Sequence, residues 1–265
     1  MKLTEFAPSA ARKVLVYGPP KTGKTDLVGR LAEHYVLHWI DLEDGIKTLL
    51  HSPRIKKEWL ERINYYHISD TQINPVGIET MLKVIKGGAK KICHAHGAVD
   101  CIRCKALPAE AHSVLDLGSF GPQDILVIDS VSQLSASAMN YIQKDVIQKD
   151  NYDKKPDWDD YAKQGRVLDR IFSILQQAPF HCVVISHENL VEMEDGKKKL
   201  VPIAGTSQFS KTFAKYFDTV VYTDIVNKRH KAASSTTYSG SIVMGCRYGS
   251  ELEKQENPSL LELFK

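Results

Sequence analysis

The sequence predicts an α/β fold, a mostly parallel sheet that carries helices on both faces. Short apolar segments with strand character alternate along the chain with segments in which apolar residues recur at helical spacing. A glycine-rich loop lies between the first of these strands, 13–17, and the helix that follows it. Ligands of such folds bind at the carboxyl ends of the strands, so the polar residues at those ends are the candidate functional residues.

The elements can be assigned in order along the first half of the chain. The segment 26–34 is predicted to be a helix because Leu27, Val28 and Leu31 fall on one face. Pro75 suits the first turn of a later helix, where its fixed φ is already helical. The predicted strands here are 37–42, 63–68 and 124–129, and the remaining predicted helices are 75–86 and 131–148.

The second half begins with a polar segment, Lys149 to Asp160, which leads into a helix that ends near Gln177. The later elements are separated by two polar loops, of which 188–205 carries three consecutive lysines and 225–240 is basic. Strands are predicted at 181–186, 218–223 and 241–246, with a short helix at 207–215.

The composition limits the possible classes of protein. With 265 residues and 43% hydrophobic content, the chain can form one domain over 1–265, interrupted by a small Cys/His insertion at 88–121. The net charge of +3 is small, so nucleic acid would have to be bound by local patches. The chain has no signal peptide and no apolar run of about 18 residues, which predicts a soluble cytoplasmic protein with no membrane partner.

The glycine-rich loop matches G-x-x-x-x-G-K-[ST], the phosphate-binding P-loop. Its backbone N–H groups and the following helix N-terminus would bind a polyphosphate, Lys24 would reach the β- and γ-phosphates, and the Thr25 hydroxyl group would bind Mg²⁺. The sequence therefore predicts a nucleoside triphosphate as ligand. The candidate contact residues are Gly18, Pro19, Pro20, Lys21, Thr22, Gly23, Lys24, Thr25 and Asp26.

Three further candidates follow predicted strands. Asp129 ends an apolar strand, where an NTPase needs a carboxylate for Mg²⁺. Glu43 follows the strand 37–42 and can act as the general base that activates water, although an acid that merely begins a helix is the alternative. His187 follows 181–186 and can hydrogen-bond the γ-phosphate; an ordinary loop histidine is the alternative.

The order of these motifs resembles that of the RecA-like ATPases. The matching segments are the P-loop, Ile-Asp-Leu-Glu at 40–43, Val-Ile-Asp-Ser at 127–130 and Val-Ile-Ser-His-Glu-Asn at 184–189. More narrowly, the chain resembles, from Lys13 to Tyr248, the phage nucleotide-binding proteins that include the Sak-type single-strand annealing recombinases. The resemblance implies a RecA-like fold, ATP as the nucleotide, Glu43 as catalytic base, Asp129 as the metal-site acid and His187 where the family often has a glutamine sensor.

The same resemblance implies an ATPase that acts on single-stranded DNA in phage recombination or annealing inside a bacterial host. DNA stimulation and a single-strand binding protein as partner are expected with it. Three alternatives stay open: a small-molecule P-loop kinase, an ATP-dependent packaging or helicase-type motor, and an ATP-switched DNA-binding module without significant turnover. A compact arginine-rich lid, as a kinase would need, is not found in the sequence.

Two segments are candidates for binding the DNA. The loop Glu188 to Gly205 carries Lys197, Lys198 and Lys199, which can neutralise backbone phosphates. The segment Lys149 to Lys163 offers three aromatic side chains for base stacking, namely Tyr152, Trp158 and Tyr161. A solvated lysine-rich hairpin is the alternative for the first segment.

The basic loop Ile225 to Gly240 contains Lys228, Arg229, His230 and Lys231. One of the cations Lys228, Arg229 or Lys231 can complete the nucleotide site of a neighbouring subunit. Such a head-to-tail contact would build a ring or a filament, with nucleotide at the subunit interfaces. A solvated loop is the alternative.

The insertion contains a candidate structural zinc site. Cys93 and His96 form a C-x₂-H pair, and Cys101 and Cys104 form a C-x₂-C pair four residues further on. His94 is the alternative to His96, and reduced cysteines without a metal are the alternative to the whole site. Cys182 and Cys246 lie in predicted strands as ordinary buried residues.

Overall fold

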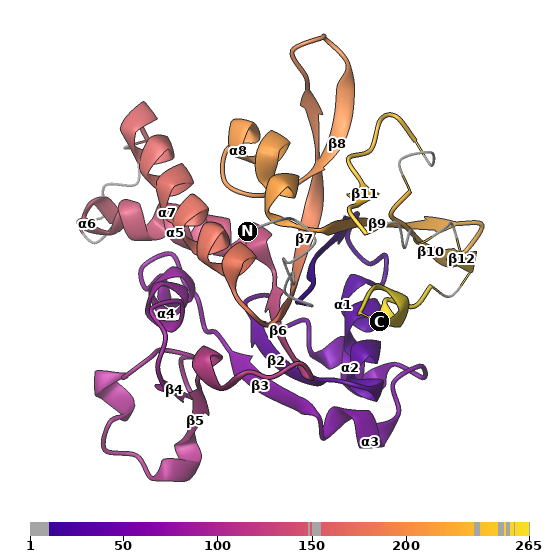
Figure 1. Ribbon diagram of the computed structural model, residues 1–265. Helices are drawn as coiled ribbons and strands as arrows, with labels where there is room; N and C mark the ends of the chain where they lie inside the picture. Colours follow the sequence, from indigo (N-terminus) through magenta and orange to yellow (C-terminus); the bar gives the residue numbers. More distant parts are fainter. Residues whose placement is uncertain are drawn as a thin grey trace, which may run out of the picture.

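The computed structural model describes residues 11–147, 149, 155–235, 239–248, 252, 255–256 and 258–264. Within them a 10-stranded sheet runs in the order β12-β10-β9-β1-β7-β6-β2-β3, with β8 paired to β7 and β11 to β9 (Figure 1). Its strands are β1 (Lys13–Gly18), β2 (Val36–Asp41), β3 (Ile63–His67), β6 (Asp124–Asp129), β7 (His181–Glu192), β8 (Lys198–Pro202), β9 (Thr219–Val226), β10 (Arg229–Ala233), β11 (Gly245–Cys246) and β12 (Gln255–Glu256).

The six central strands, from β9 to β3, are parallel to one another. Hydrophobic residues are buried on both faces of this part of the sheet, which is why its strands are almost continuously apolar. One face packs on α4 (Val76–Val84), α5 (Val131–Ile142) and α7 (Trp158–Gln177), and the other on α1 (Lys24–Gly29) and α2 (Lys47–His51) (Figure 1). The predicted fold class, a mostly parallel sheet with helices on both faces, is confirmed.

Some predicted elements were wrong in extent. The first helix changes to a 3₁₀ turn at Arg30–Glu33, and the helix predicted over 131–148 is broken at Gln143 before α6 (Lys144–Ile147). Of the strand predicted at 241–246, only β11 forms. The short helices α3 (Lys57–Leu60) and α8 (Ser207–Thr212) flank the sheet, and further 3₁₀ turns lie at Ile102–Cys104, Ala109–Ala111, Leu117–Ser119, Phe213–Tyr216 and Leu261–Phe264.

The two predicted polar loops are in fact hairpins. In the first, β7 continues past the core to Glu192 and returns as β8, with an Asp195-Gly196 turn in which Gly196 has a φ of +74°. In the second, β9 turns into β10 at Asn227 and Lys228, both with positive φ. Tight hairpin turns need positive φ, but a lysine at such a position gives no turn signal in a sequence.

The segment that contains the cysteines forms its own two-stranded sheet, β4 (Lys90–Cys93) and β5 (His112–Leu115). It lies beside α4, away from the projecting β7–β8 hairpin (Figure 1). None of the helices within the described residues is long and apolar enough to cross a membrane.

Candidate active site

Close contacts with β9 and β10 explain the glycines of the P-loop. Gly18 has a φ of +152°, and a Cβ there would lie 2.2 Å from the carbonyl oxygen of Thr223. Gly23 has a φ of +86°, and a Cβ there would lie 3.1 Å from Nδ1 of His230. The Thr22 and Thr223 hydroxyl groups are 2.8 Å apart. Strands distant in sequence therefore hold the P-loop in the conformation that the motif requires.

Lys24 is buried within its own loop. Its Nζ donates to the carbonyl oxygens of Gly18 at 3.0 Å and Pro19 at 2.7 Å. Burial lowers the pKa of Lys24 to about 8, although the carboxylates of Asp129 and Glu43 oppose the shift. A polyphosphate beside Nζ would favour the ammonium form, because an opposite charge stabilises the charged state.

Asp129 and Thr25 lie together, as expected for a magnesium site. The Thr25 hydroxyl group donates to Oδ2 of Asp129 at 3.2 Å, and Asp129 is 2% exposed at the end of β6. Burial, reinforced by the carboxylates of Asp41 and Glu43, raises the pKa of Asp129 to about 7. A hydroxyl group and buried carboxylates supply the oxygen ligands that Mg²⁺ prefers, so the residues present fit this ion.

Two side chains hold the carboxylate of Glu43. The Ser130 hydroxyl group donates to Oε1, and Nε2 of His187 lies 3.1 Å from Oε2. Burial raises the pKa of Glu43, but the hydrogen bonds from His187 and Ser130 outweigh it, so the pKa lies below its usual value. Glu43 is therefore an ionised carboxylate at neutral pH, fixed in orientation and able to accept a proton.

Asp41 is a site residue that the sequence did not single out. It is fully buried, and its carboxylate accepts the backbone N–H groups of Glu43, Gly45 and Ile46 at 3.0, 3.2 and 3.1 Å. It therefore shapes the loop 42–46, called here the catalytic loop, which carries Glu43. An aspartate just before a turn is a known signal for such bonds to the following backbone.

The predicted residues share one cavity of about 770 Å³, whose lining includes Lys24, Thr25, Glu43, Asp129 and His187. A second cavity of about 1020 Å³ shares Pro53, Arg54 and His230 with the first. Asp26 also lines the first cavity, where its buried carboxylate lies 3.3 Å from Nε of Arg54. Asp26 thus holds the guanidinium group of Arg54, a residue that lines both cavities.

The segment Lys228 to Lys231 belongs to the β9–β10 hairpin over the P-loop of the same chain. Nδ1 of His230 donates to the carbonyl oxygen of Thr22 at 2.9 Å, and Lys228 and Arg229 line the second cavity. His230 therefore contacts the nucleotide site of its own subunit, a role that its sequence context did not indicate.

The family model AAA_24, described as an AAA domain, matches residues 10–248. The chain belongs to this AAA-domain family. Among solved structures, the KaiC-like protein PH0186 of the hyperthermophilic archaeon Pyrococcus horikoshii OT3 is similar at 14% identity and a TM-score of 0.41, over 85% of this chain and 77% of that one. No curated protein matches the sequence. The chain is thus a P-loop ATPase of the AAA type, and the narrower phage annealing family is not singled out.

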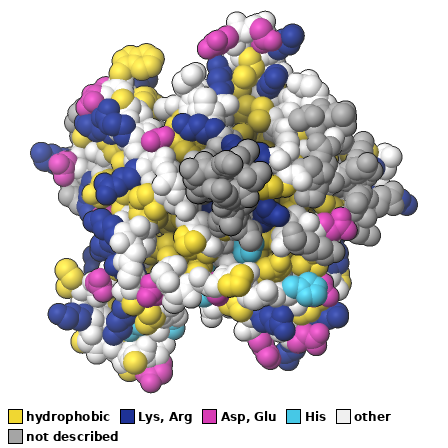
Figure 2. Space-filling view, in the orientation of Figure 1, with side chains coloured by type: hydrophobic (Ala, Val, Ile, Leu, Met, Phe, Trp, Pro, Cys, Tyr) yellow, Lys and Arg dark blue, Asp and Glu magenta, His cyan; other side chains and the backbone are white. Residues whose placement is uncertain are grey.

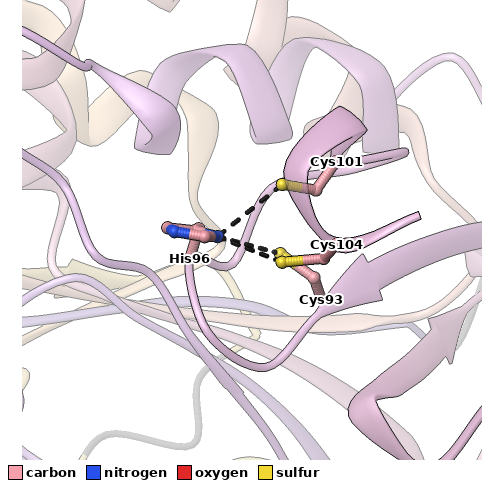
Figure 3. A group of neighbouring side chains, drawn as sticks. All are labelled: Cys93, His96, Cys101 and Cys104. Carbon is pink, nitrogen blue, oxygen red and sulfur yellow. Dashed lines mark hydrogen bonds between the residues drawn. The ribbon is translucent and has the colours of Figure 1, made fainter. Parts of the chain in front are cut away.

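This AAA domain carries a Cys₃His cluster, shown in Figure 3. The ligand atoms of Cys93, His96, Cys101 and Cys104 all lie within 4.8 Å of one another. Nδ1 of His96 faces the three sulfur atoms at 3.8, 3.6 and 3.3 Å. His94 instead bonds the Ser113 hydroxyl group at 2.8 Å. The geometry thus selects His96, and three thiols with one imidazole are a donor set that suits zinc.

The predicted DNA-binding residues of the AAA domain occupy two separate elements. Trp158 and Tyr161, at the start of α7, are 88% and 41% exposed. Tyr152 lies outside the described residues. On the β7–β8 hairpin Lys197 pairs with Asp195 at 3.2 Å, and basic and acidic side chains are mixed at its tip (Figure 2). The hairpin holds three lysines beside four acids, Glu188, Glu192, Glu194 and Asp195, so it is not a strongly basic surface.

Proposed function

We propose that this AAA domain hydrolyses ATP, with Glu43 as the general base. The observation that carries the proposal is the ionised Glu43 carboxylate, held by Ser130 and His187 on the cavity that also contains Lys24 and Asp129. A base in that position can accept a proton from the water that attacks the γ-phosphate. Lys24 would bind the phosphates, and Mg²⁺, held through Thr25 and Asp129, would neutralise their charge.

The second cavity would accommodate the nucleoside part of the ATP. The triphosphate occupies the P-loop cavity, and the two cavities meet at Arg54 and His230. His187 would sense the γ-phosphate, because its imidazole already contacts Glu43. A γ-phosphate would compete with Glu43 for the hydrogen bond of His187.

The protein is proposed to act on single-stranded DNA, in recombination or annealing, and to use ATP hydrolysis for this purpose. Two features support this. First, β7 is one continuous strand from His181 to Glu192, so His187 lies on the strand that forms the projecting hairpin (Figure 1). Second, Trp158 is almost wholly exposed, although tryptophan is normally well buried and single-strand binders stack bases on such rings. Because the hairpin is mixed in charge, stacking on α7 carries more of this proposal than the lysines do.

Replacing Trp158 and Tyr161 by alanine is expected to weaken single-stranded DNA binding about tenfold or more, since each stacked base contributes about 1–3 kcal/mol. The matched control is Ile174→Ala on the same helix, 41% exposed and aliphatic. Fluorescence anisotropy with a labelled oligonucleotide measures the affinity of both variants.

Changing Lys197, Lys198 and Lys199 to alanine should also flatten the salt dependence of DNA binding. Unchanged affinity in the aromatic variant together with an unchanged salt slope would rule out both surfaces.

ATP turnover with and without the oligonucleotide separates the classes of function. Faster turnover with DNA supports the proposed ATPase. Phosphorylation of an added acceptor would indicate a kinase, and tight ATP binding without turnover a switched binding module. Turnover that depends on movement along DNA would indicate a motor.

The active subunits are proposed to assemble head to tail into a ring or filament. Lys228 and Arg229 are exposed at the tip of the β9–β10 hairpin, where they line the second cavity. Either cation could complete the nucleotide site of a neighbouring subunit that packs against this hairpin.

The Cys₃His cluster is proposed to bind one structural zinc ion per chain. Protein purified without a tag or chelator is expected to contain about one zinc, as metal analysis would measure, because such a donor set binds the ion tightly. Cys101→Ser should lose it, and Cys246→Ser, which alters a cysteine away from the cluster, should retain it. A content below about 0.3 zinc per chain in the wild type would contradict the site.

A further inference from the structure

The loop that carries the zinc ligands is docked directly onto the end of β3. The backbone N–H of Ser69 donates to the carbonyl oxygen of His96 at 3.1 Å, and the Thr80 hydroxyl group of α4 donates to that of Gly97 at 2.8 Å. Gly97 has a φ of +69°, and a Cβ there would lie 2.2 Å from the carbonyl oxygen of His67. No side chain fits between these backbones, so the ligand loop and the end of β3 form one tightly packed contact.

The end of the same strand also bonds Asp41, the residue that precedes the catalytic loop. The backbone N–H of Ile68 donates to the carbonyl oxygen of Asp41 at 2.9 Å. The Tyr65 hydroxyl group lies 3.2 Å from Oδ2 of Asp41 and 3.2 Å from Nδ1 of His67. Because a carboxylate can only accept, the Tyr65 hydrogen goes to Asp41, and the Tyr65 oxygen accepts from Nδ1–H of His67.

Asp41 passes this restraint on to the catalytic loop, since its two oxygens bind the N–H groups of Glu43, Gly45 and Ile46. A buried carboxylate cannot give up these bonds cheaply, so its orientation and that of the loop are coupled. The route from the metal ligands to the catalytic base therefore consists of a backbone contact at His67–Ser69, the side chain of Tyr65 and the side chain of Asp41.

We propose that the zinc-bound Cys₃His loop is a positioning element for ATP hydrolysis. By fixing the end of β3, it keeps Tyr65 on Asp41 and thereby keeps Glu43 in place. The proposal rests on the proposed function, namely zinc in the cluster and Glu43 as base. Within the described residues, neither Tyr65 nor the ligand loop lines the P-loop cavity. They should therefore affect the rate of the chemical step and leave ATP binding nearly unchanged.

The sharpest variant is Gly97→Ala, which retains all four zinc ligands but forces the loop away from His67. It is expected to lower kcat about tenfold or more, because a small displacement of a catalytic group can cost up to about 10²-fold. KM and the ATP dissociation constant should stay within about twofold. The matched control is Gly121→Ala, where a Cβ would meet only an ordinary contact of 3.7 Å and φ is not positive.

A second pair of variants tests the route itself. Tyr65→Phe removes only the Tyr65 hydroxyl group that bonds Asp41, and it should lower kcat as Gly97→Ala does. Tyr66→Phe is its control, because that hydroxyl group bonds the carbonyl oxygen of Val114 on β5 and not the catalytic loop. Combining Tyr65→Phe with Gly97→Ala should give little further loss, since the two changes break the same chain of contacts.

Zinc content, ATP affinity and kcat are measured on each variant. An unchanged kcat in zinc-bound Gly97→Ala, or losses that simply multiply in the double variant, would overturn the proposal. Failure of the proposed function shows up separately. The wild type would then lack zinc, or Glu43→Gln would keep its turnover, whereas the proposal fails only in the comparison of the glycine and tyrosine variants.

Discussion

Replacing Glu43 by glutamine is expected to lower kcat for ATP hydrolysis by about 10²-fold or more while ATP binding stays within a few fold. Glutamine has the same shape and can still accept the Ser130 hydrogen bond, so the site should keep its geometry. What it lacks is the basic carboxylate, whose pKa is lowered by His187 and Ser130 against the opposing effect of burial. Steady-state phosphate release gives kcat, and a fluorescent ATP analogue gives the affinity.

Asp44→Asn is the matched control for Glu43→Gln. Asp44 is the next residue of the catalytic loop, is exposed and pairs with Lys47, and asparagine tolerates its φ of +57°. This variant should hydrolyse ATP at nearly the wild-type rate. Near-normal turnover in Glu43→Gln would remove Glu43 from the mechanism, even if ATP binding and the fold are intact.

Replacing Lys24 by alanine is expected to weaken ATP binding about 10- to 100-fold and to abolish measurable turnover. Below its pKa of about 8 the side chain carries the positive charge that the phosphates require, and it already lies inside the P-loop. The loss should appear in the presence and absence of Mg²⁺, because Lys24 acts on the phosphates directly. Isothermal titration with ATP measures it.

Asp129→Asn distinguishes inactivation through loss of the metal from inactivation through loss of the phosphate contact made by Lys24. Asp129 acts through the metal, so this variant should bind ATP normally without Mg²⁺ and lose the gain in affinity that the ion gives the wild type.

Lys47→Ala is the control for Lys24→Ala, because it removes the positive charge of an exposed lysine on α2 nearby. If Lys24→Ala bound ATP as tightly as the wild type, the P-loop would not be the phosphate site.

Much of this site could be predicted from local patterns. The P-loop and Glu43 follow apolar strands, Asp129 ends one, and His187 lies directly after the buried part of β7. Parallel strands bring these positions to one edge of the sheet. The four residues of the Cys₃His cluster could also be predicted from the sequence, because their spacing is a local property. The spacing already favoured His96 over His94, because its two-residue gap from Cys93 matches the gap between Cys101 and Cys104. In the structure His94 bonds Ser113 beside the β4–β5 pair instead.

The contacts that could not be predicted are those between segments far apart in sequence. His230 reaches Thr22 across 208 positions, and Ser130 reaches Glu43 across 87. The β7–β8 and β9–β10 hairpins were missed because their outer halves are polar and contribute few residues to the core. Asp41 was overlooked beside Glu43, since only the fold shows that its carboxylate is buried under the catalytic loop.

The most direct test of the account is a single-turnover measurement with γ-labelled ATP and excess protein, in Mg²⁺, on the wild type and Glu43→Gln. The account predicts that the wild type converts the bound ATP to ADP and free phosphate, and that the rate of this step falls about 10²-fold or more in the variant, while both proteins bind the same amount of ATP. Wild-type protein that binds ATP and Mg²⁺ but releases no phosphate, with or without single-stranded DNA, would contradict it.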